Sequence, residues 1–314
     1  MKDAYGREIQ YLRLSVTDLC NLRCRYCMPE EGVCKLRHED LLTEDEMLAA
    51  VEAAASLGVR KLRITGGEPL LKKNVLSICR RASSVPGIEE VCLTTNGLLL
   101  PELASPLREA GVTRLNLSLD TLDPETYLKL TRREPPQDLL AGLKAALAAG
   151  FRKIKINAVL LHGINDREIP ALAALTKLYP VDVRFIERMP LPGDPELQDA
   201  YLPASAVLDA LPELMPEDAE GVARLYRLPG AQGRVGLIAP VSAPFCAGCD
   251  RLRLTADGRL KPCLHGGEEF PIKGLTKEQM LETMKKAVLS KPLRHALTPS
   301  GGSGAGRTMN RIGG

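Results

Sequence analysis

The sequence predicts an α/β fold: a partial (βα)6 barrel of the TIM type, with a smaller C-terminal region that completes its open side. Strand-like runs alternate with helical runs over about the first two thirds of the 314 residues, which is typical of parallel strands joined by right-handed crossovers. Six such units are too few for a closed barrel of eight strands. The expected strands also alternate polar and apolar residues, so one face of the sheet is polar. A doubly wound open sheet is the alternative.

The six expected strands are short and are separated by helical stretches. They begin at Tyr11 (YLRLSV), Lys61 (KLRIT), Glu90 (EVCLT), Thr113 (TRLNLSL), Lys153 (KIKINAV) and Val181 (VDVRFIE). The clearest helix begins after Thr43, which has Glu46 three residues later as in a capping box, and it ends at Gly58. Two further helices are expected over 101–111 and 136–150, and each of them ends on glycine.

The polar strand face is rich in cations. It carries Arg13, Ser15, Arg63, Thr65, Asn116, Ser118, Asp120, Lys153, Lys155 and Asn157, while leucine, isoleucine and valine dominate the opposite face. In a partial barrel the helices cover the apolar outside, and the polar face lines a wet, basic lumen. Such a lumen suits a large anionic substrate, because the arginine guanidinium matches the geometry of phosphate.

We expect three parts along the chain. Residues 1–215 form the barrel, and 216–300 form the smaller region, with short strands and a helix from Thr276 to about Ser290. Residues 301–314 contain six glycines and no apolar periodicity, so their composition predicts a flexible tail.

Composition excludes several classes of protein. No apolar run reaches the length of a membrane span. A net charge of +3 and the absence of tryptophan argue against a nucleic-acid partner. The first ten residues lack the apolar segment of an export signal, and nine cysteines in such a chain indicate a reducing compartment, the cytoplasm. Three of the nine, Cys34, Cys79 and Cys92, are scattered and are assigned no role.

Three more cysteines follow the first expected strand. Cys20, Cys24 and Cys27 have the spacing C-x3-C-x2-C. A [4Fe–4S] cluster held by three cysteines keeps one iron open to a ligand. A structural zinc site would need a fourth ligand, for which Cys34 and His38 are the local candidates. The spacing therefore indicates either an open iron–sulfur cluster or a zinc site.

A second triplet lies near the end of the chain, at Cys246, Cys249 and Cys263. A structural zinc site that includes His265 is a serious alternative here. Arg251 and Arg253 share one strand face directly after Cys249. We therefore interpret this triplet as a second cluster whose open iron has an anionic ligand held against it.

The first triplet, with Tyr26 before its last cysteine, and the stretch ITGGEPLL after the second strand resemble the radical S-adenosylmethionine superfamily. The resemblance implies that S-adenosylmethionine binds the open iron and that an electron donor reduces the cluster, which yields a 5′-deoxyadenosyl radical. The turn at Gly66 and Gly67 and the negative charge of Glu68 suit the ammonium group of that cofactor.

The second triplet, its two arginines and the terminal Gly-Gly resemble the GTP 3′,8-cyclase family, from about Ile9 to Gly314. This implies conversion of GTP to (8S)-3′,8-cyclo-7,8-dihydroguanosine 5′-triphosphate in molybdenum cofactor biosynthesis. The radical would abstract the ribose 3′ hydrogen, and the second [4Fe–4S] cluster would bind the purine. The next enzyme, cyclic pyranopterin monophosphate synthase, is an implied partner, and a homodimer is left open.

The resemblance also assigns residues. Contacts to GTP are implied for Arg13, Arg63, Thr94, Lys155, Arg251 and Arg253, and contacts to S-adenosylmethionine for Tyr26, Gly67, Glu68, Ser118 and Met189. The implied catalytic set is Arg13, Arg251, Arg253, Gly313 and Gly314. The resemblance implies that Gly313 and Gly314 reach into the site, and we favour this over a free tail. Leu19 stands where many relatives carry arginine. The rival interpretations are another two-cluster radical enzyme, such as a peptide maturase, and a non-catalytic iron–sulfur or zinc protein.

Overall fold

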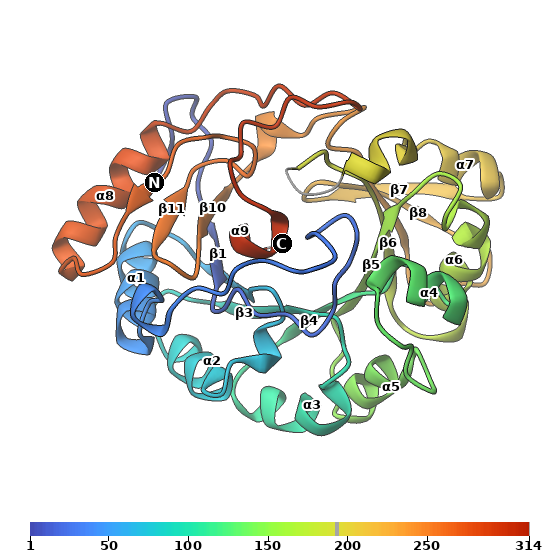
Figure 1. Cartoon of the computed structure of the whole chain (residues 1–314), viewed down its shortest axis with the longest axis horizontal. Helices are drawn as coiled ribbons and strands as arrows, with labels where there is room; N and C mark the ends of the chain where they lie inside the picture. Colours follow the sequence, from blue (N-terminus) through green and yellow to red (C-terminus); the bar gives the residue numbers. More distant parts are fainter. Residues whose placement is uncertain (192–194, 314) are drawn as a thin grey trace.

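The computed structural model describes residues 1–191 and 195–313 of the chain. A single sheet runs through these residues in the order β12-β11-β10-β1-β2-β3-β4-β5-β6-β9-β8-β7. Its centre consists of six neighbouring parallel strands: β1 (Tyr11–Ser15), β2 (Lys61–Thr65), β3 (Glu90–Thr95), β4 (Arg114–Ser118), β5 (Ile154–Leu160) and β6 (Asp182–Glu187). Figure 1 shows the sheet curving around a central space. The predicted α/β partial barrel is confirmed.

Helices cover the outer side of the curved sheet (Figure 1). They are α1 (Glu44–Ser56), α2 (Val75–Ser83), α3 (Leu100–Glu109), α4 (Pro124–Thr131), α5 (Ala141–Ala148), α6 (Ile169–Leu178), α7 (Ala206–Ala210) and α8 (Lys277–Leu289). Short 3-10 turns are η1 (His38–Asp40), η2 (Pro69–Leu71), η3 (Asp166–Glu168), η4 (Pro195–Ala200) and η5 (Cys246–Gly248). Strand residues such as Leu12, Ile64 and Leu115 are fully buried in one continuous core under the helices. A doubly wound sheet would carry helices on both faces, so that alternative is wrong.

The C-terminal region extends the sheet at both ends. After β6 come β9 (Val235–Ile238), which is parallel, and then β8 (Ala223–Arg227) and β7 (Met215–Glu220), which are antiparallel. At the other end, β10 (Arg251–Leu254) pairs in parallel with β1 and is followed by β11 (Arg259–Lys261) and β12 (Phe270–Pro271). These strands continue the sheet of the barrel, so the proposed division at residue 215 stays a prediction.

Three sequence expectations differ from the structure. The helix expected over 136–150 begins only at Ala141. Lys153 lies outside the lumen: it precedes β5, its side chain is 63% exposed, and its ammonium group lies 3.8 Å from Glu90. Strand β7 was missed because MPEDAE is a polar, largely exposed edge segment without the apolar alternation that marks a half-buried strand.

The tail is also not a free segment in the structure. Met309–Ile312 forms α9, which lies in the central space of the barrel (Figure 1). Ala305, Asn310 and Ile312 are buried. Composition alone misses this packing because the buried side chains are few and widely spaced. Of all the helices in the described residues, none has the length and apolar character needed to cross a bilayer.

Helices α1 and α8 pack side by side, and each of them begins with a capping box. Thr43 and Thr276 are the N-caps, and Glu46 and Gln279 close the two boxes. The second carboxylate oxygen of Glu46 also accepts a hydrogen bond from the Gly274 backbone, 2.9 Å away, in the loop before α8. Glu46 therefore supports both helix starts, whereas Gln279 supports only its own.

We predict that Glu46→Ala accelerates amide hydrogen exchange both at Thr43, the N-cap of α1, and at Gly274, whereas Gln279→Ala accelerates exchange only at Thr276, the N-cap of α8. Each lost hydrogen bond is worth about 1 kcal/mol, or roughly fivefold in the exchange rate. Exchange followed by mass spectrometry of peptides over 43–50 and 272–283 measures both effects. Equal patterns in the two variants would contradict the bridging role of Glu46.

Candidate active site

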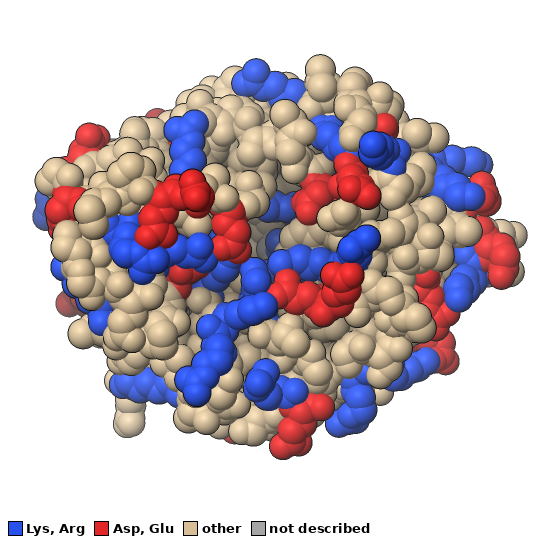
Figure 2. Space-filling view, turned by 180° about the vertical axis from the view of Figure 1, so that it is seen from behind, with Lys and Arg blue, Asp and Glu red and all other residues tan. Residues whose placement is uncertain are grey.

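A cavity of about 720 Å³ fills the lumen and is lined by all six cysteines of the two triplets. Its volume lies within the range typical of sites for small molecules. In the space-filling view of Figure 2, a hollow opens at the centre of the face, with lysine and arginine atoms inside it and charges of both signs around it. The expected basic lumen is therefore present as a cavity that joins the two cysteine groups.

Strand register concentrates the cations on one wall. In the parallel ladder β10–β1–β2, Arg253, Arg13 and Arg63 lie directly opposite one another and form one row. Burial, and to a smaller extent the charge of the nearby Arg253, holds the pKa of Arg13 well below its usual range. Burial and the neighbouring Arg251 lower the pKa of Arg253 to about 10. Arg13 and Arg253 are therefore costly to keep charged, which favours an anionic ligand beside them. Burial alone would lower the pKa of Arg63 as well, but Tyr11, Cys92 and Glu90 outweigh burial and raise it.

The next row of the same ladder contains Tyr11, a residue that sequence reasoning missed. The ring of Tyr11 lies 5.4 Å from the Lys61 ammonium and 5.8 Å from the guanidinium groups of Arg63 and Arg251. Its hydroxyl accepts a hydrogen bond from Nε of Arg63. Burial would raise the pKa of this phenol, but Arg63, Arg13 and Arg251 outweigh burial and lower it. Tyr11 thus contacts several cations of the cavity wall at once. Its position two residues before Arg13 could have placed it on the same polar strand face from sequence alone.

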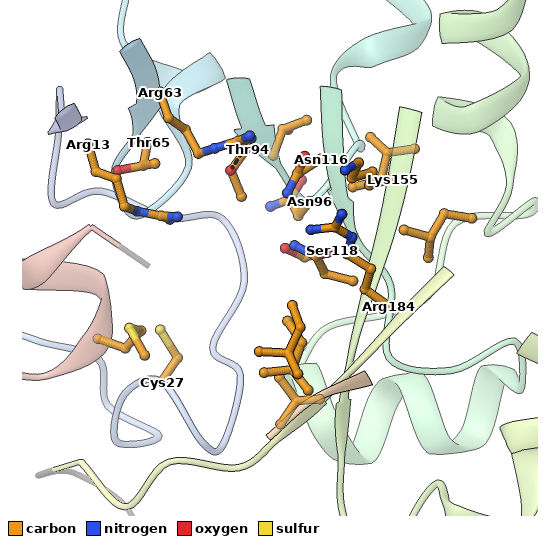
Figure 3. A pocket seen from close by; sticks show the side chains of 18 of the residues that line it. Arg13, Cys27, Arg63, Thr65, Thr94, Asn96, Asn116, Ser118, Lys155 and Arg184 are labelled. Carbon is orange, nitrogen blue, oxygen red and sulfur yellow. Dashed lines mark hydrogen bonds between the residues drawn. The ribbon is translucent and has the colours of Figure 1, made fainter. Parts of the chain in front are cut away.

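Further along the same curved sheet, β3 to β6 supply polar residues and two more cations (Figure 3). Arg63 donates to the Thr94 hydroxyl at 3.2 Å, and Asn116, Ser118 and Lys155 also line the cavity. Burial and the neighbouring Arg184 lower the pKa of Lys155 to about 8. Arg184 itself lines the cavity from β6 and was missed, although its alternation with Val183 and Phe185 could have placed it on the polar face.

The first triplet lies in a loop that other side chains hold. The backbone N–H of Cys27 donates to the Cys24 carbonyl at 2.9 Å. Tyr26 donates to Asp120 at 2.6 Å, and the other Asp120 oxygen accepts from the Val159 backbone at 2.7 Å. Burial raises the pKa of Asp120 to about 6 and that of the Cys27 thiol to about 12. Metal binding at these buried thiols would therefore have to displace protons. Of the alternative zinc ligands, Cys34 is exposed and His38 lies outside the cavity wall.

The Gly-Gly-Glu-Pro turn is bonded to the segment that leads into this triplet. The N–H groups of Gly67 and Glu68 donate to the carbonyls of Thr17 and Leu19, at 2.8 and 2.7 Å. A Cβ atom at Gly67 would lie 2.3 Å from the Leu19 carbonyl oxygen, so only glycine fits. The Leu19 side chain is 40% exposed.

The carboxylate of Glu68 is buried and already engaged. It accepts hydrogen bonds from Thr95 Oγ1 (2.7 Å), the Asn96 backbone (2.7 Å) and the Leu70 backbone (3.1 Å). Burial raises its pKa to about 7. Glu68 therefore holds the turn, and a contact from it to an ammonium group stays a prediction. Met189, the last of the expected cofactor contacts, lines the same cavity.

The second triplet differs electrostatically from the first. Cys246 begins η5 and Cys249 follows its last residue. Lys291, which sequence reasoning missed, is buried and interacts with Cys249. Burial would raise the pKa of Cys249, but Lys291 and Arg251 outweigh it and lower the pKa. The Lys291 ammonium also bonds the carbonyls of Arg251 (2.8 Å) and Pro262 (2.6 Å). From the N-terminal segment, Arg7 donates to the Cys246 carbonyl at 2.8 Å.

Both triplets fit iron–sulfur clusters. Each supplies three thiols, which leaves one iron of a four-iron cluster open. Within residues 1–191 and 195–313, no three His, Cys, Asp or Glu side chains lie close enough together to hold one metal ion. In a cluster each cysteine binds a different iron, so its thiols are spaced more widely than the ligands of a single ion. His265, the expected zinc alternative, lies against His295 and Ser303.

Comparisons with known proteins agree with this arrangement. Residues 14–176 match the Radical SAM superfamily, and residues 181–297 match Molybdenum Cofactor Synthesis C. The GTP 3′,8-cyclases of Alkaliphilus oremlandii and Pelotomaculum thermopropionicum are 42% and 45% identical to this chain, with 100% of both chains covered in each case. The chain belongs to the GTP 3′,8-cyclase family. As a radical S-adenosylmethionine enzyme of that family, it is expected to hold a [4Fe–4S] cluster and S-adenosylmethionine.

Solved structures show the same fold. Streptococcus suis SuiB superposes with a TM-score of 0.65 at 15% identity, covering 91% of this chain and 67% of SuiB. The crystal structure of SuiB bound to S-adenosylmethionine gives 0.62 at 18% identity and covers 82% of this chain and 61% of that one. At these identities the likeness to SuiB concerns the fold alone.

The tail reaches the cavity of this family member, where Met309 and Asn310 form part of the lining. Nη1 of Arg253 donates to the Gly313 carbonyl at 3.0 Å, and Asn310 donates to the Asp18 carbonyl at 3.3 Å. Gly313 has φ +87°, and a Cβ there would lie 2.7 Å from Thr65 Oγ1. Gly314 lies outside the described residues.

Arg307 anchors this tail to the C-terminal region. Its guanidinium binds Asp257, in the turn after β10, at 2.9 and 3.1 Å, and Glu269, before β12, at 2.7 and 2.8 Å. Burial lowers the Arg307 pKa, but the two carboxylates outweigh burial and raise it. A fork of this kind depends on the planar guanidinium, which lysine cannot replace.

We predict that Arg307→Lys releases the tail although it keeps the charge. Loss of the two-sided fork should cost about 2 kcal/mol of docking free energy, or roughly thirtyfold faster amide exchange over 305–313. Arg311→Lys is the matched control, because Arg311 bonds only the Cys34 carbonyl among its described contacts. If exchange over the tail were equally fast in both variants, Arg307 would not be the anchor.

Proposed function

We propose that this enzyme acts on GTP as its relatives are named to do, and that the two cysteine triplets hold two clusters with separate roles. The observation that carries the proposal is that both incomplete triplets line one cationic cavity. One triplet lies beside the Gly-Gly-Glu-Pro turn and the other beside Arg251 and Arg253. The cavity therefore has one end suited to S-adenosylmethionine and another suited to an anionic nucleotide. The product would be the 3′,8-cyclised nucleotide of molybdenum cofactor biosynthesis.

The residues at the end of the cavity with the first triplet would bind the first cluster and S-adenosylmethionine. Cys20, Cys24 and Cys27 would hold the first cluster, which with S-adenosylmethionine supplies a 5′-deoxyadenosyl radical after reduction by an electron donor. Tyr26, Gly67, Ser118 and Met189 line the cavity where that cofactor would lie. Their donors and carbonyls would orient it so that the ribose of GTP faces the site of radical formation.

At the other end, Cys246, Cys249 and Cys263 would hold the second cluster, with the purine at its open iron. Arg13, Arg63, Thr94, Lys155 and Arg184 line the cavity and would bind the triphosphate. Charge-assisted hydrogen bonds from buried guanidinium groups are strong, and the phosphate charge relieves the repulsion among them. Gly313, held by Arg253, would exclude water from the space between cofactor and nucleotide.

The deciding experiment is anaerobic reduction of the reconstituted protein with S-adenosylmethionine and GTP, ATP or no nucleotide. We predict that 5′-deoxyadenosine forms and that GTP specifically yields a cyclised product. If the formation of 5′-deoxyadenosine did not depend on GTP, the proposal would be wrong and another two-cluster radical enzyme would be favoured. If no 5′-deoxyadenosine formed, although iron and sulfide were present, a non-catalytic protein would be favoured.

Cys27→Ser should lose about half of the bound iron, whereas Cys34→Ser, which alters an exposed thiol, should lose none.

Lys155 makes nucleotide binding depend on pH. Its pKa is lowered to about 8, so it is charged below pH 8 and loses its charge as the pH rises through that value. Phosphate raises the pKa of a bound ammonium, so GTP binding takes up a proton above pH 8. We predict that the dissociation constant of GTP rises by up to about fivefold from pH 8 to pH 9.

Lys155→Arg is the control, since arginine stays charged in this range and the extra pH dependence should disappear. Titration of the nucleotide itself affects both proteins equally. Parallel pH profiles for the two proteins, measured by anaerobic calorimetry, would exclude Lys155 as the titrating group.

A further inference from the structure

Glu220 is an acidic side chain at the edge of the cationic cavity. It is the last residue of β7, and Glu220, Gly221 and Val222 form a hairpin tip that lines the cavity. Glu68 and Asp120, which also line the cavity, face protein hydrogen-bond donors at the first triplet. Of the acidic cavity-lining side chains in the described part of the chain, Glu220 is the one that forms ion pairs with cations of the cavity wall.

The two carboxylate oxygens of Glu220 face different partners. Oε1 lies 2.9 Å from the Lys155 ammonium and 3.7 and 3.9 Å from the guanidinium groups of Arg114 and Arg184. Oε2 lies 2.7 Å from Arg234, which is outside the cavity wall and is itself held by Asp182 at 2.8 Å. One oxygen thus occupies the cationic subsite, and the other is anchored behind it.

We infer that Glu220 is an anionic placeholder: Oε1 occupies the subsite for the outer phosphates of the nucleotide, and the phosphate chain displaces it on binding. This inference rests on the proposed function, because it assigns a role at the proposed triphosphate site. Carboxylate and phosphate oxygens accept the same charge-assisted hydrogen bonds from lysine and arginine. They therefore compete for Lys155, Arg114 and Arg184 and cannot be bound together there without strong repulsion.

Displacement requires only a small movement. The Glu220 side chain is 42% exposed, so the carboxylate can turn toward solvent while Oε2 keeps its bond to Arg234. Gly221, which follows it, has φ +66° and no neighbouring atom within 4 Å of a Cβ position, so the hairpin tip has room. The burial of Lys155 favours occupation of the subsite by some anion at all times, and Glu220 supplies that anion before the nucleotide arrives.

The consequence is that the subsite selects nucleotides, which are also held at the base and ribose, over small free polyanions. A nucleotide held at its base and ribose delivers its phosphates at high effective concentration and displaces Glu220. A small free polyanion lacks that anchor and is kept out. A guanosine monophosphate has too short a chain to compete for the outer subsite, so Glu220 should be neutral toward it.

The test compares GTP, GMP and inorganic pyrophosphate as ligands of the reconstituted holoprotein, by anaerobic calorimetry. Glu220→Gln keeps the shape of the side chain and removes its charge. We expect this variant to bind GTP and pyrophosphate about three- to tenfold more tightly, with GMP changed by less than about twofold. Glu217→Gln is the matched control: Glu217 lies on the same strand, binds Arg227 and does not line the cavity. It should leave all three dissociation constants unchanged.

Weaker or unchanged GTP binding in Glu220→Gln would overturn the inference, because the carboxylate would then position the cations or help to hold the nucleotide. Uniform tightening of all three ligands would also overturn it, since that is a general change of charge. If the unaltered protein bound no GTP, the proposed function would fail. The pyrophosphate arm would still test whether Glu220 guards the subsite.

Discussion

The parallel pairing of β10 with β1 is the interaction on which the rest of the site depends. It places Arg251 opposite Tyr11 and Arg253 opposite Arg13, although these residues are about 240 positions apart in sequence. Because the segment before β10 carries Cys249, the same pairing brings the second triplet to the barrel that holds the first. A slip of one residue would turn Arg251 and Arg253 to the outside and leave their leucine neighbours in the lumen.

That pairing places several positive charges close together in a buried wall. Adjacent guanidinium groups in a buried wall repel one another, and burial lowers the pKa values of Arg13 and Arg253. Tyr11 softens this repulsion by presenting its hydroxyl and ring to several cations at once. Further along the sheet, Glu220 supplies a negative charge to the cations of β4, β5 and β6. The lumen is therefore built to be completed by an anion, which links its stability to its ligand.

Local patterns account for most of what could be predicted. Alternation along a strand fixes the side-chain direction, so Arg13, Arg63 and Lys155 were placed in the lumen from sequence. The same rule failed for Lys153, which lies before its strand begins, and it could have found Arg184. Lys291 and Arg7 could not be predicted, because their roles arise from contacts with carbonyls far away in the chain. Spacing identified both cysteine triplets but not the opposite pKa shifts at Cys27 and Cys249, which depend on whether a buried cation is nearby.

The position of the tail follows from the same strand pairing. Arg253 of β10 binds the Gly313 carbonyl, and Arg307 binds Asp257 and Glu269 from the segments around β10, β11 and β12. The tail can therefore dock only after β10 has joined β1 and the small antiparallel strands have formed beside it. Glycine is needed at its tip, because a Cβ at Gly313 would meet Ser15 and Thr65 at the ends of β1 and β2. Because the contacts that hold the tail come from β10 and the segments beside it, docking of the tail is coupled to completion of the sheet.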